Sequence, residues 1–300
     1  MEIKRILLPT DFSDTAAKAL KQALFLTAMF NAELVVLHAR VLYEDDAAQL
    51  PKELARLHDE EEEMERAILN YMKECTKGKD HLTIKHELIR GYSAPSAILG
   101  YLNNNPFDLV VIGTHGRTGL EHFLIGSVAE KVVRYAPCPV LTISRKAEAE
   151  TEFKTILVPF DFSEHARLAL KSALEWAALF EAKLHLLYVI EKDVHPALYS
   201  WGMKSVLDIV PDIKVKAEAK MDSILKELHV PQNISVEKRI VEGVPHKEIA
   251  KVADQLSVDL VVIATHGLVG LDRFLLGSTT ERLIRSLNRP ILTLKQRKVI

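Results

Sequence analysis

The sequence predicts an α/β protein built from two tandem domains, each a five-stranded parallel sheet flanked by helices. Short apolar runs alternate along the chain with segments in which apolar residues recur at helical spacing. The apolar runs are continuous, which is typical of strands that helices cover on both faces. The same order of elements occurs twice in the 300 residues, and a repeat of this length indicates two copies of one domain.

Three pairs of similar motifs establish the repeat. The segment 6–13 contains Asp11 and recurs as the segment 156–163, where Asp161 stands 150 residues further on. The step Gly126-Ser127 recurs as Gly277-Ser278, and the segment 139–143 recurs as 290–294, both 151 residues later. We therefore expect one domain at 1–147 and a second at 153–300. The polar and charged segment 144–152 between them reads as a linker.

Each copy is expected to alternate strand and helix. In the first copy the predicted strands are 6–9, 33–41, 83–89, 109–112 and 140–143, with a helix capped by Ser13 and further helices over 51–77, 94–102 and 127–135. In the second copy the predicted strands are 155–158, 183–190, 234–241, 260–263 and 291–294. Parallel strands end at one edge of a sheet, so the turns after the first and fourth strands of each copy should meet there. Sheets of this kind bind their ligands at that edge.

Composition and charge exclude several classes of function. The formal net charge is −2, with 39 basic and 41 acidic residues, which gives no electrostatic case for binding nucleic acid or an anionic membrane. No apolar run approaches the ~18 residues that a membrane span needs. The segment that begins at Met1 leads directly into a predicted strand, so we expect no signal peptide. Cys75 and Cys138 show no metal or redox spacing. We expect a protein of the reduced cytoplasm.

A glycine-rich turn is the strongest functional signal in the chain. It follows the apolar strand 109–112, begins at Gly113, and leads through Gly116 and Gly119 to Gly126 and Ser127, where a helical pattern starts. Glycines let a backbone approach a ligand closely, and the N–H groups at a helix start favour negative charge. The turn therefore predicts a site for the phosphates of a nucleotide.

The spacing of these glycines separates the turn from the common nucleotide motifs. The chain contains no GxxxxGK[ST] sequence, and Gly113, Gly116 and Gly119 are three residues apart, unlike GxGxxG. The full pattern is Gly113-x2-Gly116-x9-Gly126-Ser127, with a Pro-x-Asp at the end of the first strand. This pattern resembles the universal stress protein family in its ATP-binding class, and its two copies resemble the tandem form of that family. The resemblance covers nearly all of the chain.

The resemblance implies a Rossmann-like fold of the adenine nucleotide α-hydrolase type and an adenine nucleotide site in each copy. In the first copy the implied nucleotide-binding residues are Pro9, Thr10, Asp11, Ala39, Ile112, Gly113, His115, Gly116, Arg117, Gly126, Ser127 and Val128. Their counterparts in the second copy are Pro159, Phe160, Asp161, Val189, Ala264, His266, Gly267, Gly277, Ser278 and Thr279. Asp11 would contact the adenosine, and the Gly126-Ser127 step the distal phosphates. The ligand would be ATP, ADP or AMP, with Mg²⁺ held through phosphate oxygens.

Several of these residues have a purely structural alternative. Asp11 could form an Asx-type turn before the Ser13 cap. Ser127 with Glu130, and Ser278 with Glu281, match the S-x-x-E capping box, although capping by the side chain leaves backbone N–H groups for phosphate.

The histidines of the chain give no sign of catalysis or metal binding. His115 and His266 have no nucleophile or carboxylate at a suitable spacing, so we expect them to bond locally or to touch the ligand. His38 and Tyr188 occupy matching strand positions and should be packing residues. The acidic run 59–63 is expected to be a solvated helix face, and no residues show metal-ligand spacing.

The second copy departs from the pattern where Ala264 replaces the first glycine. If that position requires a positive φ or a close backbone approach, a Cβ there would obstruct the ligand; if it has ordinary strand geometry, alanine costs little. We expect the first domain to be the better nucleotide site.

Three classes of function remain open on these grounds. The first is a stress-response switch that binds ATP and is not an enzyme, apart from weak incidental hydrolysis. The second is an enzyme: a nucleotidyl transferase or an ATP pyrophosphatase would carry a HIGH-like or SGGxDS-like loop at the end of the first strand, and none is present, which leaves a slow ATP-hydrolysing enzyme. The third is a nucleotide-free interaction scaffold, which the replacement at Ala264 favours for the second copy only. Because the family pairs domains through the last strand, we also expect the two copies to form an intramolecular pseudo-dimer. Two such chains could form a homodimer.

Overall fold

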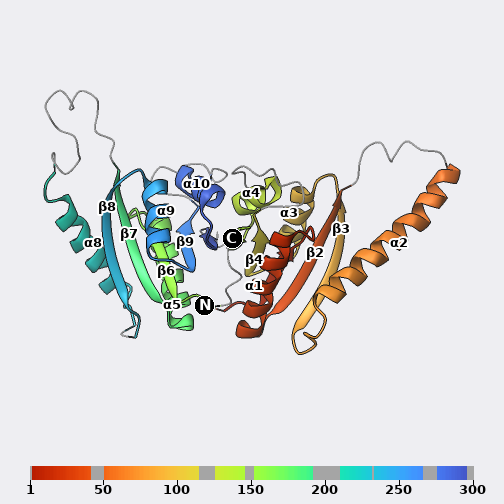
Figure 1. Cartoon of the computed structure of the whole chain (residues 1–300), viewed down its shortest axis with the longest axis horizontal. Helices are drawn as coiled ribbons and strands as arrows, with labels where there is room; N and C mark the ends of the chain where they lie inside the picture. The colour runs from red at the N-terminus through yellow and green to blue at the C-terminus, as the bar shows by residue number, and fades with distance from the viewer. Residues whose placement is uncertain are drawn as a thin grey trace, which may run out of the picture. The chain divides into compact units, whose positions relative to one another are not determined.

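The computed structural model describes residues 2–41, 51–114, 126–145, 152–191, 210–231, 233–265 and 276–295, with no side-chain description for 51–61 and 64. The chain divides into two compact units, 2–145 and 146–300. Figure 1 colours the first unit from red to yellow-green and the second from green to blue. Histidine 115, Gly116, Arg117, His266 and Gly267, predicted to bind nucleotide, lie outside the described residues.

The first unit is a five-stranded sheet whose strands are parallel in every recorded pairing, with the order β3-β2-β1-β4-β5. Its elements in chain order are β1 (Arg5–Pro9), α1 (Asp14–Phe30), β2 (Glu33–Val41), α2 (Pro51–Cys75), β3 (Thr83–Gly91), α3 (Ala94–Asn104), β4 (Leu109–Gly113), α4 (Ser127–Tyr135) and β5 (Val140–Ile143). The predicted fold class of alternating strands and helices is confirmed.

The second unit repeats this topology in the order β10-β9-β6-β7-β8. Its elements are β6 (Thr155–Pro159), α5 (Glu164–Phe180), β7 (Lys183–Glu191), α8 (Ile213–Glu227), β8 (Val236–Gly243), α9 (Pro245–Gln255), β9 (Leu260–Ala264), α10 (Ser278–Ser286) and β10 (Ile291–Leu294). Strand β8 begins two residues after the predicted start. The N–H of Ile234 bonds instead to the carbonyl of Pro231 at 3.0 Å, which keeps that residue in a turn.

The side on which the chain adds new strands to each sheet changes beside the first strand. From β1 it steps outward to β2 and β3, and then returns to the other side of β1 with β4 and β5. Because parallel crossovers are right-handed, the outward and return helices cover opposite faces. The recorded contacts agree: α1 packs on β1 and β4, α2 packs on β3, and α3 contacts α4. The carboxyl ends of β1 and β4 therefore adjoin at the point where the strand order reverses.

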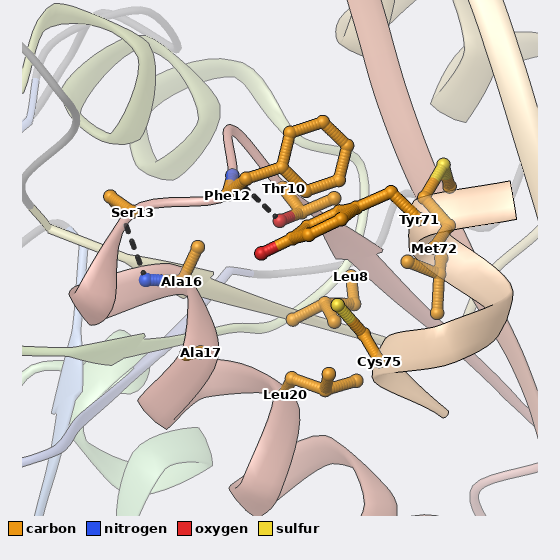
Figure 2. Close-up of a pocket in the computed structure, with 11 residues that line it drawn as sticks. Leu8, Thr10, Phe12, Ser13, Ala16, Ala17, Leu20, Tyr71, Met72 and Cys75 are labelled. Atoms are coloured by element: carbon orange, nitrogen blue, oxygen red, sulfur yellow. Dashed lines mark hydrogen bonds between the residues drawn. The ribbon is translucent and has the colours of Figure 1, made fainter. Parts of the chain in front are cut away.

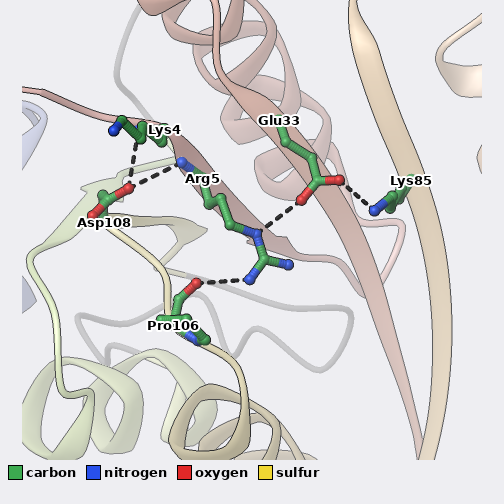
Figure 3. A network of polar contacts seen from close by, with 6 residues as sticks. All are labelled: Lys4, Arg5, Glu33, Lys85, Pro106 and Asp108. Carbon is green, nitrogen blue, oxygen red and sulfur yellow. Dashed lines mark hydrogen bonds and ion pairs between the residues drawn. The ribbon is translucent and has the colours of Figure 1, made fainter.

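An aspartate at the amino ends of the strands links β1 to β4. The carboxylate of Asp108 accepts hydrogen bonds from the backbone N–H groups of Lys4 and Arg5 at 2.9 and 3.1 Å, as Figure 3 shows. In the second unit Asp259 accepts from Lys154 and Thr155, both at 2.8 Å. Hydrogen bonds that involve a carboxylate are stronger than neutral ones, so this contact fixes the pairing of the two strands that end at the candidate site.

A small pocket lies beneath α2 in the first unit. It holds about 50 Å³ and is open to one side. Figure 2 shows its lining, which comes from β1, the loop after it, α1, β2 and α2: Leu8, Thr10, Phe12, Ser13, Ala16, Ala17, Leu20, Val36, Tyr71, Met72 and Cys75.

The second unit carries a longer side chain at the position that leaves this space. Met72 of α2 and Met221 of α8 are both fully buried, so the two helices align through these residues. In that alignment Cys75, which is exposed at the mouth of the pocket, corresponds to Ile224, which is 4% exposed and part of the core. The pocket of the first unit thus lies where a β-branched side chain of the second unit packs.

We expect Cys75→Ile to fill this pocket and to raise the free energy of unfolding by about 0.5–1 kcal/mol, because it removes apolar surface from water. Chemical denaturation of the full chain measures the change. Cys75→Ser, which adds no volume, serves as the control. A gain in both variants, or in neither, would contradict this account of the pocket.

His185 of β7 is the one described histidine that is fully buried. Burial lowers the pKa of its imidazole below the ordinary 6.5, and the positive charges of Arg239 and Lys183 lower it further, while Glu237 opposes them. The folded state therefore takes up this proton at a lower pH than the unfolded state does. The contribution of neutral His185 to the free energy of unfolding is fully present above pH 6.5, and it is lost as the pH falls toward the folded-state pKa.

The matching residue of the first unit is Val35, which is also buried. We expect His185→Val to flatten the fall of the unfolding free energy between about pH 7 and pH 5, since it removes a group that the unfolded state protonates first. Denaturation series at several pH values test this. An unchanged slope would exclude His185 as a source of the acid sensitivity.

Candidate functional site

The turn after β1 is built around an aspartate in both units. The Oδ1 atom of Asp11 accepts hydrogen bonds from the N–H and the hydroxyl of Ser13, at 3.1 and 2.7 Å. Ser13 Oγ then accepts from the N–H of Ala16 at 3.2 Å and caps α1. In the second unit Asp161 accepts from the N–H of Ser163 at 3.0 Å. The Asx turn considered for Asp11 is thus confirmed.

A phenylalanine with a left-handed backbone completes this turn. Phe12 has φ of 64° and its counterpart Phe162 has φ of 63°. A side chain with a Cβ adopts this conformation at a cost of roughly 1 kcal/mol, so its presence in both units indicates that the surroundings impose it. The N–H of Phe12 donates to Thr10 Oγ1 at 3.1 Å, as Figure 2 shows. The conformation turns the backbone from the end of β1 toward the start of α1.

Aromatic and charged neighbours hold the two phenylalanines in place. The ring of Phe12 stacks on His38 with centroids 4.7 Å apart and meets Tyr71 edge-on at 5.1 Å. Phe162 meets Tyr188 edge-on at 4.7 Å, and Lys220 lies over its ring at 4.6 Å. The packing role predicted for the two β2 and β7 residues is confirmed.

His38 also bonds the turn directly. Its Nδ1 lies 2.8 Å from the carbonyl oxygen of Thr10. Because a carbonyl only accepts, Nδ1 carries the proton in this contact. In the second unit, burial raises the pKa of Tyr188, and the carboxylates of Glu191 and Asp161 raise it further. The same strand position therefore supports the Pro-x-Asp turn in each unit, by different chemistry.

The end of β2 supplies a backbone surface beside this turn. The N–H of Thr10 donates to the carbonyl of Leu37 at 2.8 Å, which ties the turn to β2 two residues before Ala39. Ala39 and its counterpart Val189 are half-buried at the carboxyl ends of their strands, where a ligand could reach their backbone.

A buried threonine closes the glycine-rich loop at its base. The N–H of Thr114 donates to Ile143 of β5 at 2.9 Å, and its carbonyl accepts from the N–H of Gly126 at 2.6 Å. In the second unit Thr265 bonds to Leu294 at 3.0 Å and to Gly277 at 2.7 Å in the same way. These bonds bring the ends of the loop together, so that the start of α4 lies next to the end of β4 although the residues between them are not described.

The helices that begin here have no side-chain cap. Gly126 is the N-cap of α4 and Gly277 the N-cap of α10, and neither position has a side chain to accept a bond from the helix. The predicted capping boxes are therefore wrong. Ser127 and Ser278 are the first helical residues instead of the caps, because each chain enters its helix one residue earlier through the bond between glycine and threonine.

This start leaves backbone donors for a ligand. The first N–H groups of a helix, here those of Ser127 and Val128, find no acceptor within the helix itself. Ser127 and Ser278 are exposed, and Val128 and Thr279 are half-buried. By contrast, α1 and α5 begin with Ser13 and Ser163, whose hydroxyls do accept from their helices. An anion is the natural acceptor at the two uncapped starts.

The position of Gly113 answers one of the open questions about Ala264. Gly113 is not among the described glycines with positive φ, and a Cβ built there would lie 3.0 Å from Thr15 Cγ2 and 3.2 Å from the N atom of Ala16. The close approach is therefore to α1. In the second unit Ala264 accommodates its methyl group and is 7% exposed. Ordinary strand geometry thus holds at this position, and the close neighbour of a Cβ is the helix.

The remaining predicted residues frame these contacts. Pro9 and Pro159 end β1 and β6, with Phe160 just beyond in the core, and Ile112 is buried one residue before Gly113. Sequence reasoning missed Phe12 and Thr114 with their counterparts Phe162 and Thr265. Their recurrence at matching places in both copies was the available signal. Among the described residues no group of three histidine, cysteine or acidic side chains could hold a metal ion, and no described helix could cross a membrane.

Comparisons with known proteins agree with this geometry. The model of the universal stress protein family matches residues 2–144 and again 152–295. Universal stress protein MJ0577 of Methanocaldococcus jannaschii is 36% identical over 157 residues, which cover 48% of this chain and 96% of that protein. Universal stress protein Rv2005c of Mycobacterium tuberculosis is 26% identical over 283 residues, 90% of this chain and 89% of its own length.

A solved structure extends the likeness to both units. A universal stress protein from Archaeoglobus fulgidus matches with a TM-score of 0.63 over 98% of this chain and 97% of its own, at 22% identity, which establishes the fold. With two matches of the family model spanning nearly its whole length, the chain belongs to the universal stress protein family in a tandem, two-domain form.

Proposed function

We propose that this chain binds an adenine nucleotide, ATP in particular, at the carboxyl edge of its sheets and acts as a stress-response switch. One observation carries the proposal: the uncapped start of α4, fastened beside the end of β4 by the bond between Thr114 and Gly126. The same arrangement recurs at α10. Phosphate oxygens would accept from the N–H groups of Ser127 and Val128, and the helix dipole would favour their charge.

The turn after β1 would receive the nucleoside. Asp11 is half-buried at the end of the strand next to β4, and its Asx turn fixes the carboxylate in place. Acceptor oxygens so placed suit the hydroxyls of a ribose. Ala39 would offer backbone to the base at the end of β2. Mg²⁺ would be held by phosphate oxygens.

Binding, with catalysis at most incidental, is the better account of the described residues. Ser13 is the hydroxyl nearest to Asp11, and it is engaged on both sides, as donor to the carboxylate and as acceptor from Ala16. A nucleophile committed to a helix cap is poorly placed to attack a phosphate. We expect the full chain to retain ATP unhydrolysed over many minutes; rapid turnover at saturating ATP would instead favour an enzyme.

Ser127→Asp tests the phosphate site with two opposed readouts. An aspartate at the first helical position should raise the unfolding free energy of the ligand-free chain by about 0.5 kcal/mol through the helix dipole. The same charge should weaken ATP binding by roughly tenfold, which corresponds to about 1.4 kcal/mol. Calorimetric titration of nucleotide-stripped protein and denaturation of the same sample measure the two effects.

Ser127→Asn is the neutral control, and Ser278→Asp is the matched variant in the second unit. Unchanged ATP affinity in both aspartate variants would contradict phosphate binding at these helices. The prediction that the first unit binds more tightly no longer has the steric argument from Ala264, because that position has ordinary strand geometry. It is kept as a proposal: Ser127→Asp should remove the tighter of two binding phases, and two equal sites per chain would contradict the asymmetry.

A further inference from the structure

The outer strands of the two units carry opposite charges at equivalent positions. Strand pairing identifies these positions, because β3 pairs with β2 in the same register as β8 pairs with β7. Residues that match in this register have reversed signs at three places. They are Lys85 and Glu237, Glu87 and Arg239, and Arg90 and Glu242.

The charge on the neighbouring strand is reversed together with the charge on the outer strand. Glu33 of β2 forms an ion pair with Lys85 at 2.5 Å, as Figure 3 shows. In the second unit Lys183 stands at the position of Glu33 and forms an ion pair with Glu237. The attraction between the strands is thus kept, while its polarity is inverted.

A third residue follows the same pattern. The guanidinium of Arg5 on β1 lies 2.8 Å from Glu33, and together Lys85 and Arg5 hold the pKa of that carboxyl below its ordinary value. In the second unit, where the residue at this place is a lysine, β6 has the uncharged Thr155. An arginine there would face Lys183, so the substitution fits the inverted polarity.

Stability of the folded state does not require the inversion. Lys85 is 58% exposed and Lys183 is 45% exposed, and exposed ion pairs contribute at most about 1 kcal/mol. Coulomb attraction is also the same for either order of the two charges. With the residue on the first strand matched to it, as Arg5 is to Glu33, either order serves the native unit. The order then distinguishes a partner from the same unit from one of the other unit.

The apolar residues do not distinguish the two partners. Leu34 and Leu37 of β2 match Leu184 and Leu187 of β7, and all four are fully buried. An outer strand of one unit would therefore find a similar apolar surface on the other. Repeat proteins are prone to this kind of misassembly while they fold.

We propose that the inverted polarity is a recognition device that restricts each outer strand to its own unit, or to the same unit of another copy of this chain. If β8 docked on β2, Glu237 would lie beside Glu33. If β3 docked on β7, Lys85 would lie beside Lys183. In this register the two charges are diagonal neighbours whose long side chains can meet, as the native pairs show, so like charges at these places repel each other. Specificity gained from such repulsion costs the native state little stability.

A chain with matched polarities tests the proposal. Arg5→Thr, Glu33→Lys, Lys85→Glu and Glu87→Arg together give the first unit the charges of the second at these four positions. The pair between residues 33 and 85 keeps its attraction, while the bonds of Arg5 to Glu33 and to the carbonyl of Pro106 are lost. We expect the unfolding free energy to fall only by what the lost Arg5 contacts contribute. After dilution from denaturant, the misassembled fraction should rise roughly fivefold, as a loss of about 1 kcal/mol of discrimination implies. Size-exclusion with light scattering over a range of chain concentrations measures this fraction.

A second variant distinguishes the effect of equal charges in the two units from the effect of the substitutions themselves. It adds Thr155→Arg, Lys183→Glu, Glu237→Lys and Arg239→Glu, so that the two units have exchanged their charges and differ again. This chain should refold with the yield of the original protein. The proposal is overturned if the matched chain refolds as well as the original at every concentration, or if the exchanged chain misassembles as much as the matched one.

Discussion

The pairing of β1 with β4, and of β6 with β9 in the second unit, is the constraint on which the two candidate sites depend. These strands are far apart in the sequence, and their carboxyl ends supply the two halves of each site, the Pro-x-Asp turn and the base of the glycine-rich loop. Asp108 and Asp259 each accept two backbone N–H groups at the amino end of this pairing. A carboxylate at one edge of the sheet thereby sets the register at the other edge, where a shift of one residue would separate the aspartate turn from the loop.

Local strain and local rigidity are combined in the turn after β1. The left-handed backbone of Phe12 is unfavourable in isolation, and contacts from three different elements hold it: the hydroxyl of Thr10, the ring of His38 and the ring of Tyr71. The second unit imposes the same φ with a different set of neighbours. What the two units share is the path of the backbone, and the side chains that secure it have diverged.

Sequence patterns predicted the strands, the repeat and the carboxyl edge as the place of the site, because all three depend on periodicity and apolar composition. They did not predict how the helix after the loop begins. The pattern S-x-x-E is compatible with Ser127 as the cap or as the first helical residue, and a hydrogen bond from Gly126 to Thr114, twelve residues earlier, decides between them. The backbone of Phe12 was also beyond local propensity, which favours glycine or asparagine in that conformation. Contacts distant in sequence determine both features.

The charge inversion between the outer strands has a consequence for how such a protein can evolve. A one-domain chain that assembles with itself places every substitution twice, once in each subunit, so its copies always carry the same charges. In a tandem chain each copy accumulates its own substitutions. One copy can therefore have the pair Glu33 and Lys85 while the other has the same pair with reversed charges, Lys183 and Glu237. Fusion of two copies thus removes the symmetry that would force them to remain alike, and it lets one half keep a ligand site while the other acquires a different task.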